Sequence, residues 1–359
     1  SGLLSIVFGR LADRHGRRRM LLFTILAYTV TTAATGFSRG ITEFVVFQLF
    51  ATIFLVTELS LAQVVITEEF PASFRARGQG FLGAFAALGA GMAALLFPIF
   101  QETALGWRGL YFVGIFPLLL IAWLRRAMPE TRRWHAAHSA GETERFRLAD
   151  LLAPAWRLRF LVLLAVATAA TTAIGPAFAF ASYRATKAFA WTPSQVSAMI
   201  LLGGGVGICG WFVFGWLAER LGRGPVGVIG SVGGAVAVMI FYQTSWLFPA
   251  FALLVFMEAG AQIALNAFGT ELFPTGMRST AKAWITNAWI IGAMIGLAVV
   301  GLLSEPLGGV EGVVSALGLA PVITSPLLLL LPEPRGRELE ELSAAVGPAP
   351  KSVVSRSHP

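Results

Sequence analysis

The stretch GRLADRHGRRR at residues 9–19 returns in altered form as GWLAERLGR at residues 215–223. Both copies keep a glycine, an acid and two basic residues at one spacing, with an offset of 206. Two further pairs follow at an offset of 203: EEFP at 68–71 returns as ELFP at 271–274, and PETR at 129–132 returns as PEPR at 332–335. Three pairs in the same order predict a chain built from two similar halves in the same orientation.

The composition indicates a protein that crosses a membrane many times. Of 359 residues, 56% are hydrophobic and only 13% are charged, whereas ordinary soluble domains carry about 25% charged residues. This excludes a soluble globular enzyme and a disordered chain, and the single cysteine, Cys209, excludes a disulfide-built fold. Because each backbone amide in a bilayer must be bonded within its own helix, we expect an all-α membrane protein.

We expect a membrane span wherever about 20 consecutive residues are mostly apolar. Residues 1–8 look like the end of one further span. The ten full spans lie near 20–36, 44–66, 79–100, 109–127, 160–182, 195–217, 225–242, 246–268, 283–303 and 312–331.

The basic residues predict the orientation. If residues 9–19 form a cytoplasmic loop, 23 of the 27 Lys and Arg residues lie on the cytoplasmic side and 4 on the other. This asymmetry is typical of proteins in the cell (inner) membrane. It explains the net charge of +8 without a nucleic-acid partner, and it places the linker and the C-terminus in the cytoplasm.

The repeat predicts the organisation of the chain. The N-terminal half covers 1–127, a cytoplasmic linker 128–159, the C-terminal half 160–331 and a cytoplasmic tail 332–359. When the spans of the second half are shifted back by the repeat offset, one span and part of the next fall before residue 1. We therefore expect a bundle of two six-helix halves, of which this sequence holds about 10.5 of 12 helices.

The motif at 9–19 resembles the loop between the second and third helices of the major facilitator superfamily, and 215–223 resembles its second copy. PETRRW at 129–134 and LPEPRGRELEEL at 331–342 resemble elements of the sugar-porter-like and metabolite:proton symporter branches. The resemblance covers the whole chain and implies a transporter. The stretch 82–96 lacks the central proline of the antiporter motif, which favours symport.

The resemblance also implies a conformational latch on the cytoplasmic side. Asp13 would approach the start of the span near Thr280–Trp284, and Glu219 would approach residues 78–81. A network of ion pairs that exists in one conformation can bias a two-state equilibrium, although these charges could instead only fix topology or stay solvated. The latch residues that we expect are Asp13, Arg14, Arg17, Glu69, Arg75, Glu130, Glu219, Arg220, Arg223, Glu271, Arg278 and Glu333, with Glu68 beside them.

Two acids, Glu58 and Glu258, lie well inside spans, where a charge costs about 2.5–3.5 kcal/mol. The repeat places them on equivalent helices, so we expect both to face one cavity. Gln262 and Asn266 follow Glu258 at helical spacing and extend a polar stripe. Since burial favours the neutral form of a carboxyl group, the two acids suit proton binding, unless they only make structural hydrogen bonds. Asn287 is a further cavity candidate.

Together these features predict a secondary active transporter that moves a small metabolite, such as an organic acid, by alternating access and proton symport. An efflux antiporter of drugs or metabolites is the alternative, and a transporter-like receptor or membrane enzyme is the alternative from another class. The sequence has no P-loop, no nucleophile–base cluster and no histidine cluster for a metal. We expect no enzyme activity, no cofactor beyond the proton, and a monomer that contacts only its substrate and the bilayer.

Overall fold

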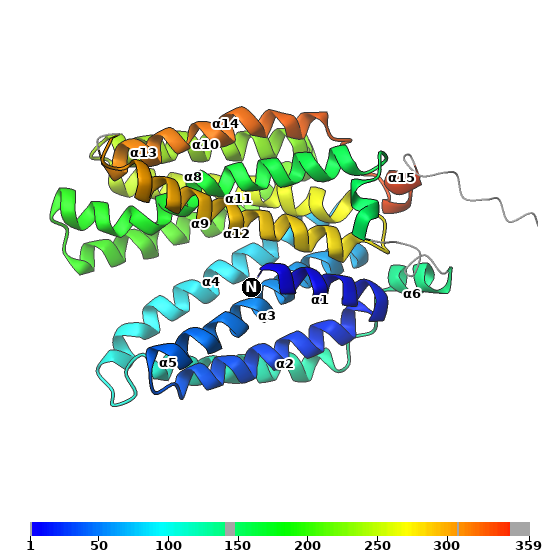
Figure 1. Cartoon of the computed structure of the whole chain (residues 1–359), viewed down its shortest axis with the longest axis horizontal. Helices are drawn as coiled ribbons and strands as arrows, with labels where there is room; N and C mark the ends of the chain where they lie inside the picture. Colours follow the sequence, from blue (N-terminus) through cyan, green and yellow to red (C-terminus); the bar gives the residue numbers. More distant parts are fainter. Residues whose placement is uncertain (1, 141–147, 307–308, 345–359) are drawn as a thin grey trace, which may run out of the picture.

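The computed structural model describes residues 2–140, 148–306 and 309–344, and regular structure in these ranges is helical throughout. Two groups of helices lie side by side, blue to cyan and green to orange in Figure 1. The first group consists of α1 (Gly2–His15), α2 (Arg17–Gly36), α3 (Ile41–Glu69), α4 (Arg75–Gln101) and α5 (Arg108–Arg125).

The second group begins after a connection that contains α6 (Arg132–Ser139) and η1 (Leu148–Leu152). Aromatic side chains such as Phe160, Phe268 and Phe273 fill one part of its core. The segments of this group are α8 (Arg157–Phe189), α9 (Pro193–Leu221), α10 (Arg223–Gln243), α11 (Leu247–Glu271), α12 (Arg278–Leu303), α13 (Val310–Leu317), α14 (Leu319–Thr324), η2 (Ser325–Leu330) and the tail helix α15 (Leu339–Ala344).

The spans predicted from hydropathy are present as helices, with one departure. The expected span 312–331 is broken into α13, α14 and η2. The breaks fall at Gly318 and near Pro321 and Pro326, because proline lacks a backbone donor and clashes with the preceding turn. Among the described residues, eight helical stretches are long and apolar enough to cross a membrane. Val310–Leu330 counts as one of them, and α2 and α4 are not among the eight. Large apolar side chains such as Ile41 and Phe116 point outward, as a lipid-facing surface requires.

The predicted loop at residues 9–19 is wrong in its extent. Helix α1 continues to His15 and α2 begins at Arg17, so Gly16 alone forms the connection. Its φ of 102° is a backbone conformation that favours glycine. The second copy repeats this arrangement, with Gly222 at a φ of 104° between α9 and α10. The acid of each motif therefore sits in the last turn of a helix.

The two halves meet most closely at one end, which we call the motif end because it carries residues 9–19 and 215–223. Near this end, a Cβ on Gly80 of α4 would lie 2.5 Å from the carbonyl oxygen of Trp211 on α9. Farther along the same two helices, a Cβ on Gly91 or Gly204 would meet nothing within 4 Å. The tail helix α15 and the linker helix α6 lie at the motif end as well (Figure 1).

Helices α8 and α12 pack so closely that Gly292 leaves no room for a side chain. A Cβ there would collide with Thr168 O and Thr171 Oγ1 of α8. We expect Gly292→Ala to cost about 1–3 kcal/mol, as overpacking does. Gly301→Ala on the same helix, where a Cβ meets nothing within 4 Å, is expected to stabilise by about 0.5–1 kcal/mol. Melting temperatures in detergent test this contrast, and two shifts of the same sign would contradict it.

Candidate functional site: the seam at the motif end

The first motif copy forms a buried cluster that reaches across to the other half. The Asp13 carboxylate accepts hydrogen bonds from the backbone N–H groups of Ser279 (3.1 Å) and Thr280 (2.9 Å) at the start of α12. The Thr280 hydroxyl donates to it as well, at 2.6 Å. Negative charge at a helix N-terminus is favourable because the unpaired N–H groups point at it. Asp13 thus contacts the helix start that the resemblance implies.

Arg17 joins this cluster to the next acid along the chain. Its Nη2 lies 3.2 Å from Asp13 and 3.1 Å from Glu68, and it donates to the carbonyl oxygen of Thr275 at 2.7 Å. All three charged side chains are fully buried. A buried ion pair compensates its desolvation only when further hydrogen bonds satisfy the remaining groups. Both Nη atoms of Arg17 donate such bonds, to the carbonyl oxygens of Ala12 and Thr275, whereas its Nε has no partner among the described residues.

The second motif copy repeats this geometry. Glu219 accepts a hydrogen bond from the backbone N–H of Ala76 in the first turn of α4, at 2.7 Å. Arg223 lies 3.2 Å from Glu219 and 3.2 Å from Glu271. The contact falls two residues before the range 78–81 that the resemblance implies, because α4 already begins at Arg75. Each half therefore binds the helix start of the other through its motif acid.

The two halves differ in the pairing of the arginine that follows the EEFP or ELFP motif, which is Arg75 in the first half and Arg278 in the second. Arg278 of the second half reaches Glu68 of the first half at 2.7 Å. Its counterpart, Arg75, instead pairs with Glu338 at 3.1 Å and donates to the carbonyl oxygen of Arg337. Glu271 Oε2 consequently has no hydrogen-bond partner among the described residues. The repeat alone gives no sign of this asymmetry, because Glu338 lies beyond the repeated motifs.

Glu130 and Glu333 cap the helices that follow the motif glycines. Glu130 Oε1 accepts from the Arg17 backbone N–H at 2.9 Å, and Glu333 Oε1 accepts from the Arg223 backbone N–H at 2.9 Å. Each carboxylate occupies the space where a Cβ on Gly16 or Gly222 would stand. The residues of the three motifs thus form one network of contacts, and this network occurs twice, once with each copy of the motifs.

Removal of one cap is expected to destabilise the second half measurably. Glu333→Ala exposes the first N–H groups of α10, and we expect a loss of about 0.5–2 kcal/mol, as for other helix caps. Glu341→Ala, at an exposed glutamate of α15, is the control and should change stability by less than about 0.5 kcal/mol. Thermal unfolding compares the two variants, and equal melting temperatures would contradict the capping role.

Three of the expected latch residues stand outside this buried network. Arg14 is exposed. Glu69 is also exposed and accepts a 3.2 Å hydrogen bond from the backbone N–H of Arg132. Arg220 is exposed and stacks on the Trp216 ring, 4.1 Å from its centroid. Their neighbours Glu68, Arg17 and Arg223 take the buried positions, because a helix turns only one side toward the seam.

The structure does not support the prediction that Glu58 shares a cavity with Glu258. Glu58 forms an ion pair with Arg125 at the end of α5 and accepts a hydrogen bond from Thr24 of α2 at 2.6 Å. Both partners belong to the first half, so Glu58 faces its own bundle. Arg125 lies in the last turn of α5, and an arginine at a helix end can extend back toward a buried acid.

Glu258 has no cationic partner within 4.0 Å among the described residues. It is 8% exposed, and its Oε1 accepts a hydrogen bond from Gln262 at 2.8 Å, one turn along α11. Its Oε2 has no partner in the described part of the chain. Asn266, one turn further, accepts instead from Lys282 of α12 at 2.8 Å. In the sequence Lys282 resembles a topology signal, because it stands with Arg278 just before the predicted span 283–303.

Hydroxyl and amide groups bridge the halves next to these residues. Thr67 of α3 donates to Thr270 of α11 at 2.8 Å, and Ser60 of α3 donates to Thr286 of α12 at 3.1 Å. Asn287 donates to Ser5 of α1 at 2.8 Å. Asn287 thus lies at the seam, where it makes one of the contacts between the two halves. These polar contacts line the seam along α1, α3, α11 and α12, whereas α4 and α9 also meet through apolar contacts such as the ring pair of Phe81 and Phe212.

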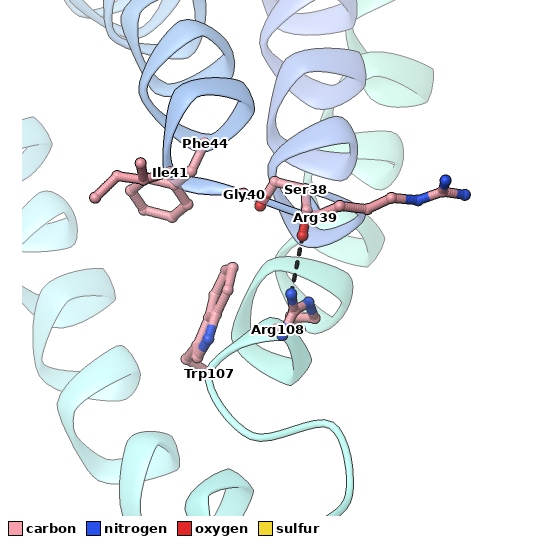
Figure 2. Close-up of a pocket in the computed structure, with 7 residues that line it drawn as sticks. All are labelled: Ser38, Arg39, Gly40, Ile41, Phe44, Trp107 and Arg108. Carbon is pink, nitrogen blue, oxygen red and sulfur yellow. Dashed lines mark hydrogen bonds between the residues drawn. The ribbon is translucent and has the colours of Figure 1, made fainter.

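Two surface pockets lie at the opposite end from the motifs. Figure 2 shows one of them, a pocket of about 280 Å³ between the α2–α3 loop and the start of α5. Arg108 donates to the carbonyl oxygen of Ser38 at 2.9 Å there, and its guanidinium lies over the Trp107 ring. The second pocket lies against Tyr183 and Glu305 in the other half. Neither pocket lies between the halves.

The tail helix α15 closes the network on the outside of the bundle. Arg133 of α6 bonds to Glu338 at 2.7 Å and to Glu340 at 2.9 Å. Partial burial raises the pKa of Glu340, but hydrogen bonds from its own backbone and from Arg133 bring that pKa below its ordinary value. Within the described ranges, no three His, Cys, Asp or Glu side chains are grouped to hold a metal ion.

The family model described as the Major Facilitator Superfamily matches residues 1–211 and 160–358. The chain belongs to the Major Facilitator Superfamily. This confirms the resemblance of the motifs, the transporter fold and the assignment to transporters rather than enzymes. The protein is therefore a multi-pass membrane protein and, as a member of this superfamily, a transporter of small metabolites.

Two relatives and one solved structure of the superfamily are informative. A cis,cis-muconate transport protein of Acinetobacter baylyi is 27% identical over 297 residues, which cover 77% of this chain and 69% of that protein. A gallate transporter of Pseudomonas putida is 26% identical over 329 residues, with 79% and 71% covered. The proton:xylose symporter XylE superimposes with a TM-score of 0.76 at 17% identity over 96% of this chain and 87% of that one, which supports the fold.

Proposed function

We propose that this superfamily member is a secondary active transporter that carries a small organic acid across the inner membrane together with protons. It works as a monomer by alternating access at the seam between the halves and needs no cofactor other than the proton. The observation that carries the proposal is the closed seam: each half binds a helix start of the other, through Asp13 and Glu219. Such contacts can form in one conformation and break in the other.

The positive-inside count supports a cytoplasmic location of the motif end, the linker and the tail. The conformation described here is then closed toward the cytoplasm. Opening requires the Asp13–Thr280, Glu219–Ala76 and Glu68–Arg278 contacts to break together. Because packed interfaces have discrete arrangements, loss of these contacts favours a second state over gradual loosening.

Glu258 supports proton coupling. Its carboxyl group is buried, lies next to the neutral Gln262 and keeps one oxygen without a partner. An ionised carboxylate at such a position is costly, so a proton that arrives with the substrate relieves the cost. Glu58 is a weaker candidate, because Arg125 already compensates its charge.

The printed names of the relatives, a muconate transport protein and a gallate transporter, support an organic acid as substrate. Efflux of a drug or metabolite by antiport remains the alternative. The two modes predict opposite responses to a proton gradient, because symport and antiport couple substrate flux to proton flux with opposite sign.

Uptake by proteoliposomes distinguishes these functions. We expect labelled cis,cis-muconate or gallate to accumulate at least tenfold more when the outside is acidic, and a protonophore should abolish the increase. Labelled hexoses and amines serve as controls. Uptake that is stimulated by an alkaline exterior would favour antiport. If the uptake of every probe is independent of the pH gradient, proton coupling is contradicted.

A further inference from the structure

Lys282 is a buried cation without a counter-charge. Its side chain is 2% exposed, and its Nζ donates one hydrogen bond, to Asn266 Oδ1 at 2.8 Å. No carboxylate lies within 4.0 Å of this ammonium group among the described residues. An ammonium group offers three N–H donors, so one neutral amide oxygen leaves most of its bonding capacity and all of its charge uncompensated.

Other buried cations near the seam are paired. Arg17, Arg223 and Arg278 each lie within 3.2 Å of at least one buried carboxylate. Arg159, at the start of α8, has no carboxylate partner in the described ranges, but its guanidinium donates to the backbone carbonyl oxygens of Leu272 and Leu342. Burial of an unpaired ammonium group is costly, so its position at a seam that moves calls for a ligand.

The pair Lys282–Asn266 lies against the first half of the molecule. On α11, Thr270 follows Asn266 by one turn and bonds to Thr67 of α3. On α12, Thr286 follows Lys282 by one turn and bonds to Ser60 of α3. Residues four apart share a helix face, so the faces that carry Lys282 and Asn266 are those that meet α3.

The position of Lys282 also links it to the closing contacts. It lies one turn beyond Arg278, whose partner is Glu68, and next to the helix start that Asp13 caps. When these contacts break, the two halves separate at this point and water and solutes reach Lys282. Glu258 lies eight residues before Asn266 on the same helix, about 12 Å away along its axis.

We propose that Lys282, oriented by Asn266, binds the carboxylate group of the transported organic acid when the seam is open at the motif end. This inference rests on the proposed function and names the group that recognises its substrate class. A carboxylate bound to Lys282 and a proton bound to Glu258 together neutralise both buried charges. The loaded seam can then close without an uncompensated charge, whereas a neutral analogue leaves Lys282 unpaired.

Uptake of matched acids and amides by proteoliposomes tests the proposal. Benzoate and cis,cis-muconate are compared with benzamide and muconamide, which keep the shape but lack the charge. In Lys282→Met, which keeps the chain length and removes the ammonium group, we expect the KM of each transported acid supplied on the motif-end side to rise at least tenfold and the acid-over-amide preference to disappear. Lys187→Met, the same change at an exposed lysine, is expected to leave both unchanged.

A measurement on the unsubstituted protein covers the case in which Lys282→Met does not fold. Acetylation of each lysine by an N-hydroxysuccinimide ester is followed by mass spectrometry. We expect a saturating transported acid to slow acetylation of Lys282 at least fivefold, while the amide leaves it unchanged and Lys187 reacts equally in all samples.

The outcomes separate the two proposals. If the wild type transports an acid but Lys282→Met keeps its KM, or if the acid does not protect Lys282 from acetylation, the role of Lys282 is refuted and the proposed function stands. If Lys282→Met lowers the melting temperature but leaves the KM unchanged, Lys282 has a packing role, and its role in substrate binding is also refuted. If the wild type transports none of the acids, the proposed function and this inference both fail.

Discussion

Replacement of Glu68 by glutamine is expected to open the motif end. Glu68 is the shared counter-charge of Arg17 and Arg278, which come from different halves and lie 3.1 and 2.7 Å from its Oε1. Its Oε2 accepts a further hydrogen bond from Thr131 at 2.6 Å. Glutamine keeps the size of the side chain but leaves two buried guanidinium groups with less negative charge between them.

Removal of one partner from a buried ion pair costs about 3–5 kcal/mol, and about 3 kcal/mol corresponds to roughly a hundredfold change in an equilibrium constant. We expect at least tenfold faster maleimide labelling of Thr270→Cys from the motif end, in a Cys209→Ser background. Glu69→Gln makes the same chemical change at the next, exposed position and should leave labelling unchanged. Equal labelling of the two variants would show that Glu68 does not hold the seam closed.

Replacement of Glu258 by glutamine is expected to abolish accumulation driven by a pH gradient. Glutamine preserves the shape of the side chain but has no carboxyl group that could bind and release a proton. We expect gradient-driven uptake to fall at least tenfold, while exchange of labelled for unlabelled substrate at equal pH continues, because exchange needs no net proton movement.

Glu58→Gln is the matched control, since it removes the other intramembrane acid. Its partner Arg125 lies at a helix end and is partly exposed, so water can solvate the freed charge. We expect this variant to lose stability but keep its response to the pH gradient. Coupling that is lost in Glu58→Gln and kept in Glu258→Gln would reverse the assignment of the proton site.

Much of the fold follows from local features of the sequence. Helical spans are imposed by the bilayer, and the glycine at position 16 is needed because the chain turns between two helices at a positive φ. The repeat then places Asp13 and Glu219 at equivalent helix ends. The helix starts that they approach in the other half, near Thr280 and near residues 78–81, follow from the family resemblance and could not be derived from the residues alone; the contact of Glu219 with Ala76 itself comes from the structure.

The remaining parts of the site depend on contacts between distant segments. Glu58 seemed equivalent to Glu258, but only the three-dimensional position of Arg125 reveals that its charge is compensated. In the sequence Lys282 stands with Arg278 just before a span, and its burial against Asn266 depends on how α11 and α12 pack. The pairing of Arg75 with Glu338 likewise depends on where the tail helix folds back.

A reversible disulfide across the seam tests directly whether the halves must separate during transport. The hydroxyl oxygens of Thr67 and Thr270 lie 2.8 Å apart, so Thr67→Cys with Thr270→Cys in a Cys209→Ser background is expected to cross-link on oxidation. Each single cysteine variant is the control. We predict that oxidation of the double variant reduces uptake at least tenfold and that reduction restores it. A fully cross-linked protein that transports at the rate of the reduced protein would contradict alternating access at this seam.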